Sequence, residues 1–221
     1  MSFNIAIDGP AGAGKSTIAR EIAARLGYIY VDTGAMYRAM ALFMLREQVD
    51  PADTAKISST CGKADITIRY ENGEQVVLLN GENVNGLIRT EAVGNMASAS
   101  SVNPDVRKKL VELQKKLAAS SDVVMDGRDI GTCVLPQADV KIYLTASTTV
   151  RAKRRYDELA AKGETCDFKQ IEEDIKERDH RDMTRELSPL KQAEDAVLLD
   201  SSDMTVEEVI EKILSLCKTK V

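Results

Sequence analysis

Histidine and cysteine are scarce in this chain, which argues against several kinds of metal and thiol chemistry. The 221 residues include one histidine and four cysteines. The cysteines stand far apart, at Cys61, Cys133, Cys166 and Cys217, and they form no C-x-x-C pair. Such spacing is typical of reduced thiols and not of a zinc site or a disulfide framework.

The chain also lacks long apolar runs and an excess of positive charge. Its apolar runs are far shorter than the roughly 20 residues that a membrane-spanning helix needs. The net charge of −5 argues against broad affinity for nucleic acid or membranes, although it is compatible with a local basic pocket. A strand is predicted almost at the first residue, which leaves no room for a signal peptide. We therefore expect a cytoplasmic protein.

What the chain does contain is a glycine-rich run, Gly9–Thr17, that matches the pattern G-x-x-x-x-G-K-[ST]. It follows a short apolar run at residues 3–7 and precedes apolar residues at helical spacing up to Leu26. Strand, loop and helix in this order are the context in which the pattern holds a polyphosphate. In that context Lys15 would reach the β- and γ-phosphates, and the Ser16 hydroxyl would ligate Mg²⁺. The predicted loop consists of Gly9, Pro10, Ala11, Gly12, Ala13, Gly14, Lys15, Ser16 and Thr17.

Strands alternate with helices along most of the chain, which predicts a parallel sheet covered on both faces. Further core strands are expected at residues 28–32, 122–126, 140–144 and 196–199. Helices are expected at about 33–46, 104–117, 148–162, 168–185 and 206–214. Residues 64–88 differ, because alternating apolar residues and Asn-Gly turns predict about three short antiparallel strands. The predicted fold is α/β, with a five-stranded parallel core.

The loop after the third core strand carries the sequence Asp-Gly-Arg-Asp, Asp126–Asp129. Ligands of parallel sheets bind at the carboxyl ends of the strands, so this loop should lie beside the glycine-rich loop. Asp126 is a candidate ligand of Mg²⁺, through water, because Mg²⁺ keeps several of its waters. An ordinary turn with an ion pair between Arg128 and Asp129 is the alternative.

The helix expected from residue 33 begins with two further candidates, Thr33 and Arg38. The Thr33 hydroxyl could cap the helix, contact a base, or do both. Arg38 stands one turn into the helix, near its positive end, where the helix dipole gives no reason for a cation. An anionic ligand bound near the start of the helix would give a reason for the positive charge of Arg38.

A cluster of basic residues follows the fourth core strand, at Arg151, Lys153, Arg154 and Arg155. Helical spacing puts Arg151 and Arg155 on one face, where like charges repel one another unless an anion joins them. A solvated helix face is the alternative interpretation. Next to a phosphate-binding loop, a lid that closes over the phosphates is favoured.

The next helix has a stripe that begins apolar and becomes charged: Ile171, Ile175, Arg178, Asp182 and Arg185. A helix that leaves the core for solvent would show this pattern, and so would a helix whose far end lines a polar cleft. The cleft is favoured, because phosphoryl transfer needs several cations around the transferred group.

Together these segments resemble the bacterial cytidylate kinases, a family of P-loop nucleoside-monophosphate kinases. The resemblance rests on residues 8–17, 32–38, 86–90, 126–132 and 176–182, which span nearly the whole chain in order. The glycine-rich loop alone is generic, whereas the Asp-Gly-Arg-Asp sequence combined with Arg178–Arg185 is specific. The resemblance implies transfer of the γ-phosphoryl group of ATP to CMP and dCMP, giving CDP or dCDP and ADP, in pyrimidine nucleotide metabolism. It also implies Mg²⁺ as the cofactor that accompanies ATP.

The resemblance further implies a three-layer α/β/α kinase core at residues 1–33 and 100–221, with a short helical lid at about 148–166. An inserted monophosphate-binding region is implied at 34–99, with its antiparallel strands at about 64–88. The expected partners are the small molecules ATP and CMP or dCMP, without nucleic acid or membrane, and the expected state is a monomer.

The functional residues of the family carry over position by position. Those implied for catalysis are Lys15, Arg128, Arg155 and Arg178; Arg151 joins the glycine-rich loop in binding ATP, and the metal ligands are Ser16 and Asp126. CMP binding is implied for Thr33, Tyr37, Arg38, Arg107, Arg128, Asp129, Arg178, Asp182 and Arg185. Within this set, cytosine would be read by Thr33, Arg107 and Asp129, the monophosphate held by Tyr37, Arg38 and Arg128, and the sugar met by Arg178 and Asp182. Arg185 would lie near the base or the phosphate.

Three other classes of protein carry a similar loop. A shikimate or adenylate kinase is disfavoured by the antiparallel insert and the Asp-Gly-Arg-Asp loop. A GTP-binding switch protein would need the sequence Asn-Lys-x-Asp, which is absent. A nucleotide-binding regulator would bind ATP and Mg²⁺ without turnover.

Overall fold

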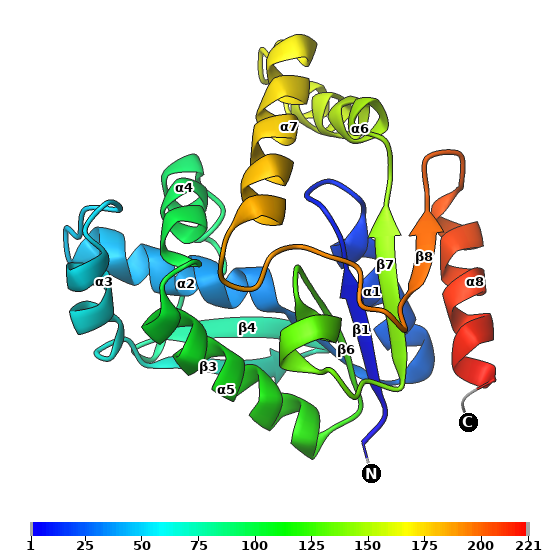
Figure 1. Cartoon of the computed structure of the whole chain (residues 1–221), viewed down its shortest axis with the longest axis horizontal. Helices are drawn as coiled ribbons and strands as arrows, with labels where there is room; N and C mark the ends of the chain where they lie inside the picture. Colours follow the sequence, from blue (N-terminus) through cyan, green and yellow to red (C-terminus); the bar gives the residue numbers. More distant parts are fainter. Residues whose placement is uncertain (1, 220–221) are drawn as a thin grey trace. The chain divides into compact units, whose positions relative to one another are not determined.

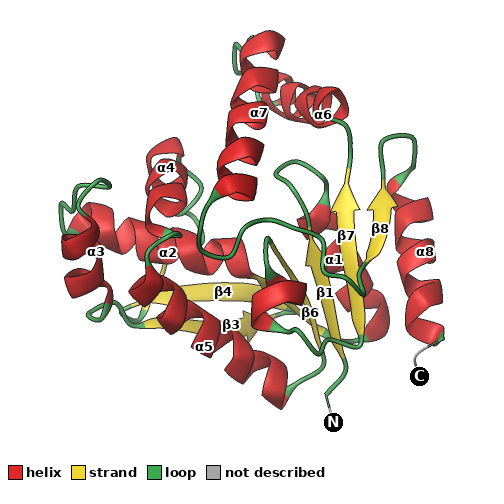
Figure 2. Cartoon of the chain, in the orientation of Figure 1, coloured by secondary structure: helices red, strands yellow, loops and turns green. Residues whose placement is uncertain are grey.

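The computed structural model describes residues 2–219 and contains two sheets. The larger sheet has the strand order β2-β6-β1-β7-β8. Its strands are β1 (Asn4–Asp8), β2 (Ile29–Asp32), β6 (Val123–Gly127), β7 (Val140–Thr145) and β8 (Val197–Asp200). β7 pairs in parallel with both β1 and β8, with Ile5 opposite Val140 and Ile142 opposite Val197. Figure 2 shows these strands in yellow, and they confirm the predicted α/β fold.

The internal contacts of the chain divide it into two units, which are described separately. The P-loop unit comprises residues 3–28 and 124–219, and the central unit comprises residues 29–123 together with Ser2. The boundaries of core, lid and monophosphate-binding region given above stay a prediction. Residues 1, 220 and 221 of the predicted core lie outside the described residues.

The P-loop unit is built around strands that are buried on both faces. Ile5, Ile7 and Leu144 are completely buried, as expected for strands of a parallel sheet covered by helices. Its helices are α1 (Lys15–Leu26), α6 (Thr148–Ala161), α7 (Phe168–Thr184) and α8 (Val206–Lys218). Helices α1 and α8 pack together, as do α6 and α7 (Figure 1). Gly27 ends α1 in the left-handed conformation, with φ of 71°, as its position after Leu26 suggests.

The central unit contains the small antiparallel sheet. Its strands are β3 (Ile66–Glu71), β4 (Glu74–Leu79) and β5 (Glu82–Asn83), which confirms the prediction for residues 64–88. Its helices are α2 (Thr33–Arg46), α3 (Thr54–Cys61), α4 (Glu91–Ser100) and α5 (Pro104–Ser120). Neither α3 nor α4 was predicted, because both are short and rich in Ala, Ser and Thr, so they have little apolar periodicity. Both begin at a side-chain cap, Asp53 and Thr90.

Gly9 fixes the point at which the glycine-rich loop leaves the sheet. Its φ is +150°, and a Cβ atom on it would lie 1.9 Å from the Leu144 carbonyl oxygen of β7. Only glycine allows β1 and β7 to stay this close while the chain turns away from the sheet.

No helix among residues 2–219 has the length and apolarity that crossing a membrane requires.

Replacing Gly9 by alanine should therefore destabilise the protein strongly. We expect Gly9→Ala to lower the free energy of unfolding by about 3 kcal/mol, because the new Cβ displaces the Leu144 carbonyl group. The matched control is Gly62→Ala, at a position in right-handed helical conformation with no neighbouring atom within 4 Å of the new Cβ. The control should change the free energy by no more than about 1 kcal/mol. Urea unfolding measures both, and equal values for the two variants would contradict this account.

Candidate active site

Lys15 begins α1 and is buried within the glycine-rich loop. Its Nζ donates a hydrogen bond of 2.7 Å to the Pro10 carbonyl oxygen, and the residue is 6% exposed. Burial lowers the pKa of Lys15 to about 7; the positive charge of Arg128 acts in the same direction, and Asp126 and Asp8 act against it. The ammonium form of Lys15 is thus disfavoured in the free protein, and a bound polyphosphate would favour it.

Ser16 and Asp126 lie together beside this loop, as predicted for the metal ligands. The Ser16 Oγ donates to Asp126 Oδ2 at 3.0 Å, and Asp126 is buried at the end of β6. A hydroxyl and a carboxylate are the hard oxygen donors that Mg²⁺ prefers. A pair of donors fits this ion, because Mg²⁺ is usually held by one or two protein groups together with substrate phosphates.

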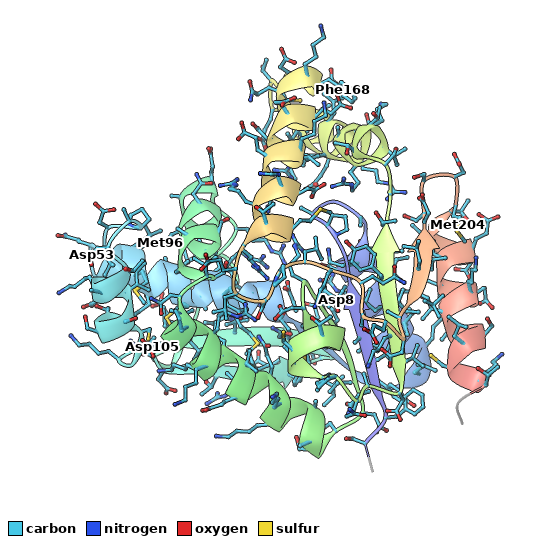
Figure 3. The ribbon with its side chains drawn as sticks, in the orientation of Figure 1. Asp8, Asp53, Met96, Asp105, Phe168 and Met204 are labelled. Carbon is cyan, nitrogen blue, oxygen red and sulfur yellow. The ribbon has the colours of Figure 1, made fainter. Side chains whose placement is uncertain are left out.

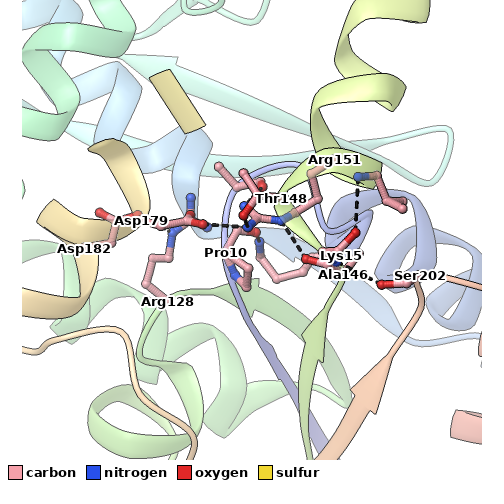
Figure 4. Close-up of polar contacts among 12 residues, drawn as sticks. Pro10, Lys15, Arg128, Ala146, Thr148, Arg151, Asp179, Asp182 and Ser202 are labelled. Carbon is pink, nitrogen blue, oxygen red and sulfur yellow. Dashed lines mark hydrogen bonds and ion pairs between the residues drawn. The ribbon is translucent and has the colours of Figure 1, made fainter. Parts of the chain in front are cut away.

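Arg128 pairs with α7 and not with its neighbour in the loop. Its Nε donates to Asp182 Oδ2 at 2.8 Å, while Asp129 lies 3.9 Å from Arg185. The partner of Arg128 is thus a residue of α7, which favours a site over an ordinary turn. Figure 4 shows Arg128 next to Asp182.

The charged residues near the end of α7 interact with residues of the glycine-rich loop and of the Asp126–Asp129 loop. Asp182 binds Arg128, and the positive charge of Arg178 contributes to the lowered pKa of Lys15. Ile175, nearer the start of the helix, is buried. This arrangement agrees with the interpretation that the far end of the helix lines a polar site.

Arg151 is buried and binds to four parts of the P-loop unit (Figure 4). Its Nε donates to the Ala146 carbonyl oxygen, and its Nη1 donates to the Ala11 carbonyl oxygen at 3.0 Å. Its Nη2 donates to Thr148 Oγ1 and to Asp179 Oδ2, the latter at 2.6 Å. Arg151 thus joins the glycine-rich loop, α6 and α7.

The rest of the basic cluster does not share the environment of Arg151. Arg155 is exposed and pairs with Glu158 on the same helix, and Lys153 pairs with Asp157. Arg154 donates from Nη2 to the Ser201 carbonyl oxygen at 2.9 Å. Arg151 and Arg155 stand four residues apart on α6, as predicted, but the first is buried and the second exposed, and their roles stay predictions.

Asp8 is a residue of the site that the sequence reasoning missed. Its Oδ1 accepts from the Ile130 N–H and its Oδ2 from the Gly131 N–H, both at 2.7 Å. Burial raises the pKa of Asp8 to about 6, against the lowering effect of these two hydrogen bonds. The signal was an acidic residue that ends an apolar strand. The π-helical turn η1 (Ile130–Val134) that follows the Asp126–Asp129 loop was also not predicted.

Asp32 organises a second group of predicted residues, within the central unit. Its Oδ1 accepts from the Ala35 N–H at 2.8 Å, so Asp32 and not Thr33 caps α2. Its Oδ2 binds Arg38 at 3.0 Å and lies 3.6 Å from Arg89. Asp32 thus supplies an anion beside Arg38 without any ligand, and the role of Arg38 in binding stays a prediction.

Arg107 is buried and lies over an aromatic ring of the same unit. Its guanidinium carbon is 5.9 Å from the centre of the Tyr37 ring, and the residue is 5% exposed. An arginine that faced solvent would not be buried in this way. The residues predicted to bind CMP thus form one group in each unit. Those of the central unit are Thr33, Tyr37, Arg38 and Arg107, and those of the P-loop unit are Arg128, Asp129, Arg178, Asp182 and Arg185.

Comparison with known proteins agrees with these observations. The family model described as cytidylate kinase matches residues 5–219. Curated proteins named cytidylate kinase are similar over nearly the full length. The protein from Caldicellulosiruptor bescii is 51% identical, and the match covers 97% of this chain and 95% of that protein. The protein from Lactobacillus gasseri is 50% identical, and the match covers 99% of this chain and 95% of that protein. A solved structure of an uncharacterised protein from Eubacterium ventriosum has a TM-score of 0.56 at 12% identity, with 99% of each chain covered, and so shares the fold.

Binding of ATP should restore the charge of Lys15. At a pH of about 8.5, an amine with a pKa near 7 is almost entirely neutral, and a bound triphosphate raises that pKa again. We therefore expect nearly one proton to be taken up per ATP bound. Calorimetry in two buffers with different ionisation enthalpies measures this number.

The control for proton uptake is Lys15→Arg, whose guanidinium stays charged throughout this range. It should bind ATP more weakly and take up no proton. Equal uptake by the wild type and the variant would show that the proton goes elsewhere.

Proposed function

Since the chain belongs to the cytidylate kinase family, we propose that it transfers the γ-phosphoryl group of ATP to CMP and dCMP. The products would be ADP and CDP or dCDP, a step of pyrimidine nucleotide metabolism. The match to the family across residues 5–219 carries the proposal. The buried cation of Lys15, with Arg128 and Arg178 close enough to lower its pKa, supports it.

The P-loop unit would bind ATP and stabilise the transferred group. Backbone N–H groups of Gly9–Thr17 and the start of α1 would surround the phosphates, with Lys15 at the β- and γ-phosphates. Ser16 and Asp126 would hold Mg²⁺, and this ion would neutralise part of the phosphate charge. Arg151, which already binds the Ala11 carbonyl group of the loop, would add to ATP binding.

Catalysis would consist of positioning and charge neutralisation. Lys15, Arg128 and Arg178 would surround the charge that spreads over the transferred group, and Arg155 would join them from α6. The Asp182 carboxylate fixes Arg128 through its Nε, which orients the guanidinium before substrate arrives. The acceptor is itself a phosphate, so no side chain needs to act as a covalent nucleophile or a strong base.

CMP would be recognised by both groups of residues. Thr33, Arg107 and Asp129 would contact cytosine, while Tyr37, Arg38 and Arg128 would contact the monophosphate. Arg178 and Asp182 would contact the sugar, and Arg185 would lie near the base or the phosphate. The burial of Arg107 and the bond that holds Arg38 to Asp32 support these roles, since both side chains are fixed in advance.

A panel of acceptors tests the proposed reaction. With ATP and Mg²⁺, we expect CMP and dCMP to give much higher kcat/KM values than UMP, AMP or shikimate. Steady-state assays of ADP release measure these values. Preference for UMP, AMP or shikimate would refute the assignment, and ATP binding without any turnover would favour a regulator.

Loss of Arg128 should remove stabilisation of the transition state. We expect Arg128→Ala to lower kcat/KM for CMP by about 10²–10³-fold, the usual effect of removing one electrostatic donor. The control is Arg46→Ala, which breaks an exposed ion pair with Glu82 and should leave kcat/KM unchanged. If Arg128→Ala behaves like Arg46→Ala, Arg128 has no catalytic role.

A further inference from the structure

The segment that carries Arg128 is fastened at both of its ends. At one end, the Asp126 carboxylate accepts a hydrogen bond from Ser16 Oγ at 3.0 Å. At residues 130 and 131, the two backbone N–H groups donate to Asp8 at 2.7 Å each. Ser16 follows the P-loop lysine, and Asp8 directly precedes Gly9. Asp8, which precedes the glycine-rich loop, and Ser16, which lies within it, therefore determine the position of residues 126–131, here called the arginine loop.

The Asp8 end of the arginine loop is the tighter of the two fastenings. Asp8 lies at the end of β1, where it is 4% exposed (Figure 3). Each of its oxygens accepts one N–H, and a carboxylate is acceptor-only when ionised. With a pKa of about 6, the group is mostly ionised at neutral pH. Hydrogen bonds to an ionised group are roughly twice as strong as neutral ones.

Gly131 allows this approach because it has no side chain. A Cβ atom there would lie 3.3 Å from Asp8 Oδ2 and 3.3 Å from Lys141 Cδ. Lys141 is itself held by Asp195, at 2.7 Å, and by the Pro136 carbonyl oxygen. The arginine loop is thus enclosed between the Asp8 carboxylate and the Lys141 stem.

We propose that Asp8 is a positioning residue for phosphoryl transfer, which acts by holding the arginine loop so that Arg128 meets the transferred group. This role rests on the proposed function. A displacement of about 1 Å of a group that contacts the reacting atoms can cost about 10²-fold in rate, so a fastening of the loop has kinetic consequences. The conformation of the glycine-rich loop has fastenings of its own at Gly9 and in the hydrogen bond from Lys15 to Pro10.

The variant Asp8→Asn separates positioning from general stability. An amide has one acceptor and one donor end, so one of the two N–H groups loses its partner. We expect kcat to fall at least about tenfold. In this background, the cost of Arg128→Ala should be at least about tenfold smaller than in the wild type, because Arg128 is already displaced. An unchanged kcat, or the full effect of Arg128→Ala, would overturn the proposal.

The control for charge and capping is Asp167→Asn. Asp167 also accepts two backbone N–H groups, those of Lys169 and Gln170, at the start of α7. Asparagine caps helices as well as aspartate does, so kcat should not change. If Asp8→Asn does not fold, Gly131→Ala tests the same fastening, since its Cβ pushes the loop away from an intact carboxylate.

Hydrogen exchange of the Ile130 and Gly131 amides, measured by NMR without nucleotide, tests the fastening independently of any substrate. We expect exchange in Asp8→Asn to be at least about tenfold faster at one or both of these amides than in the wild type. Unchanged exchange would refute the fastening. A wild type that does not phosphorylate CMP would instead refute the proposed function and leave the exchange result as it stands.

Discussion

The burial of the Lys15 ammonium is the constraint on which the rest of the site depends. Removing an ammonium group from water costs several kcal/mol unless nearby groups compensate. The Pro10 carbonyl group and the carboxylates of Asp8 and Asp126 compensate in part, while Arg128 opposes them. Burial therefore favours the neutral amine in the free protein, and a bound polyphosphate is the ligand that would favour the ammonium form again.

The parallel sheet brings this charge together from distant parts of the sequence. Asp8 ends β1, Asp126 lies near the end of β6, and Leu144 lies near the end of β7, and these three strands are neighbours. Their carboxyl ends meet at one edge, as in other open α/β sheets. The close approach at Gly9 then directs the glycine-rich loop away from that edge. The same strand packing thus determines the core and the position of the phosphate-binding groups.

The sequence predicted those features that depend on local patterns. Strong periodicity located the five core strands and α1, and the loop motif placed Ser16 next to Asp126. The sequence did not predict features that depend on contacts between residues far apart in the chain. Arg151 looked like a lid residue, yet two of its partners, Ala11 and Asp179, come from distant segments. Asp8 looked like the end of a strand, because its role depends on backbone N–H groups more than 120 residues away. Which hydroxyl or carboxylate caps α2 was likewise decided by geometry, in favour of Asp32.

The central claim is that the cations around Lys15 serve the phosphates of two nucleotides at once. A single molecule in which adenosine and cytidine are joined through five phosphates tests this most directly. Calorimetry should give one such molecule bound per chain, with an affinity well above that of ATP or CMP alone, since joining the two parts raises the effective concentration of the second. Both ATP and CMP should displace it. Displacement by ATP alone, or an affinity no higher than that of ATP, would contradict the account.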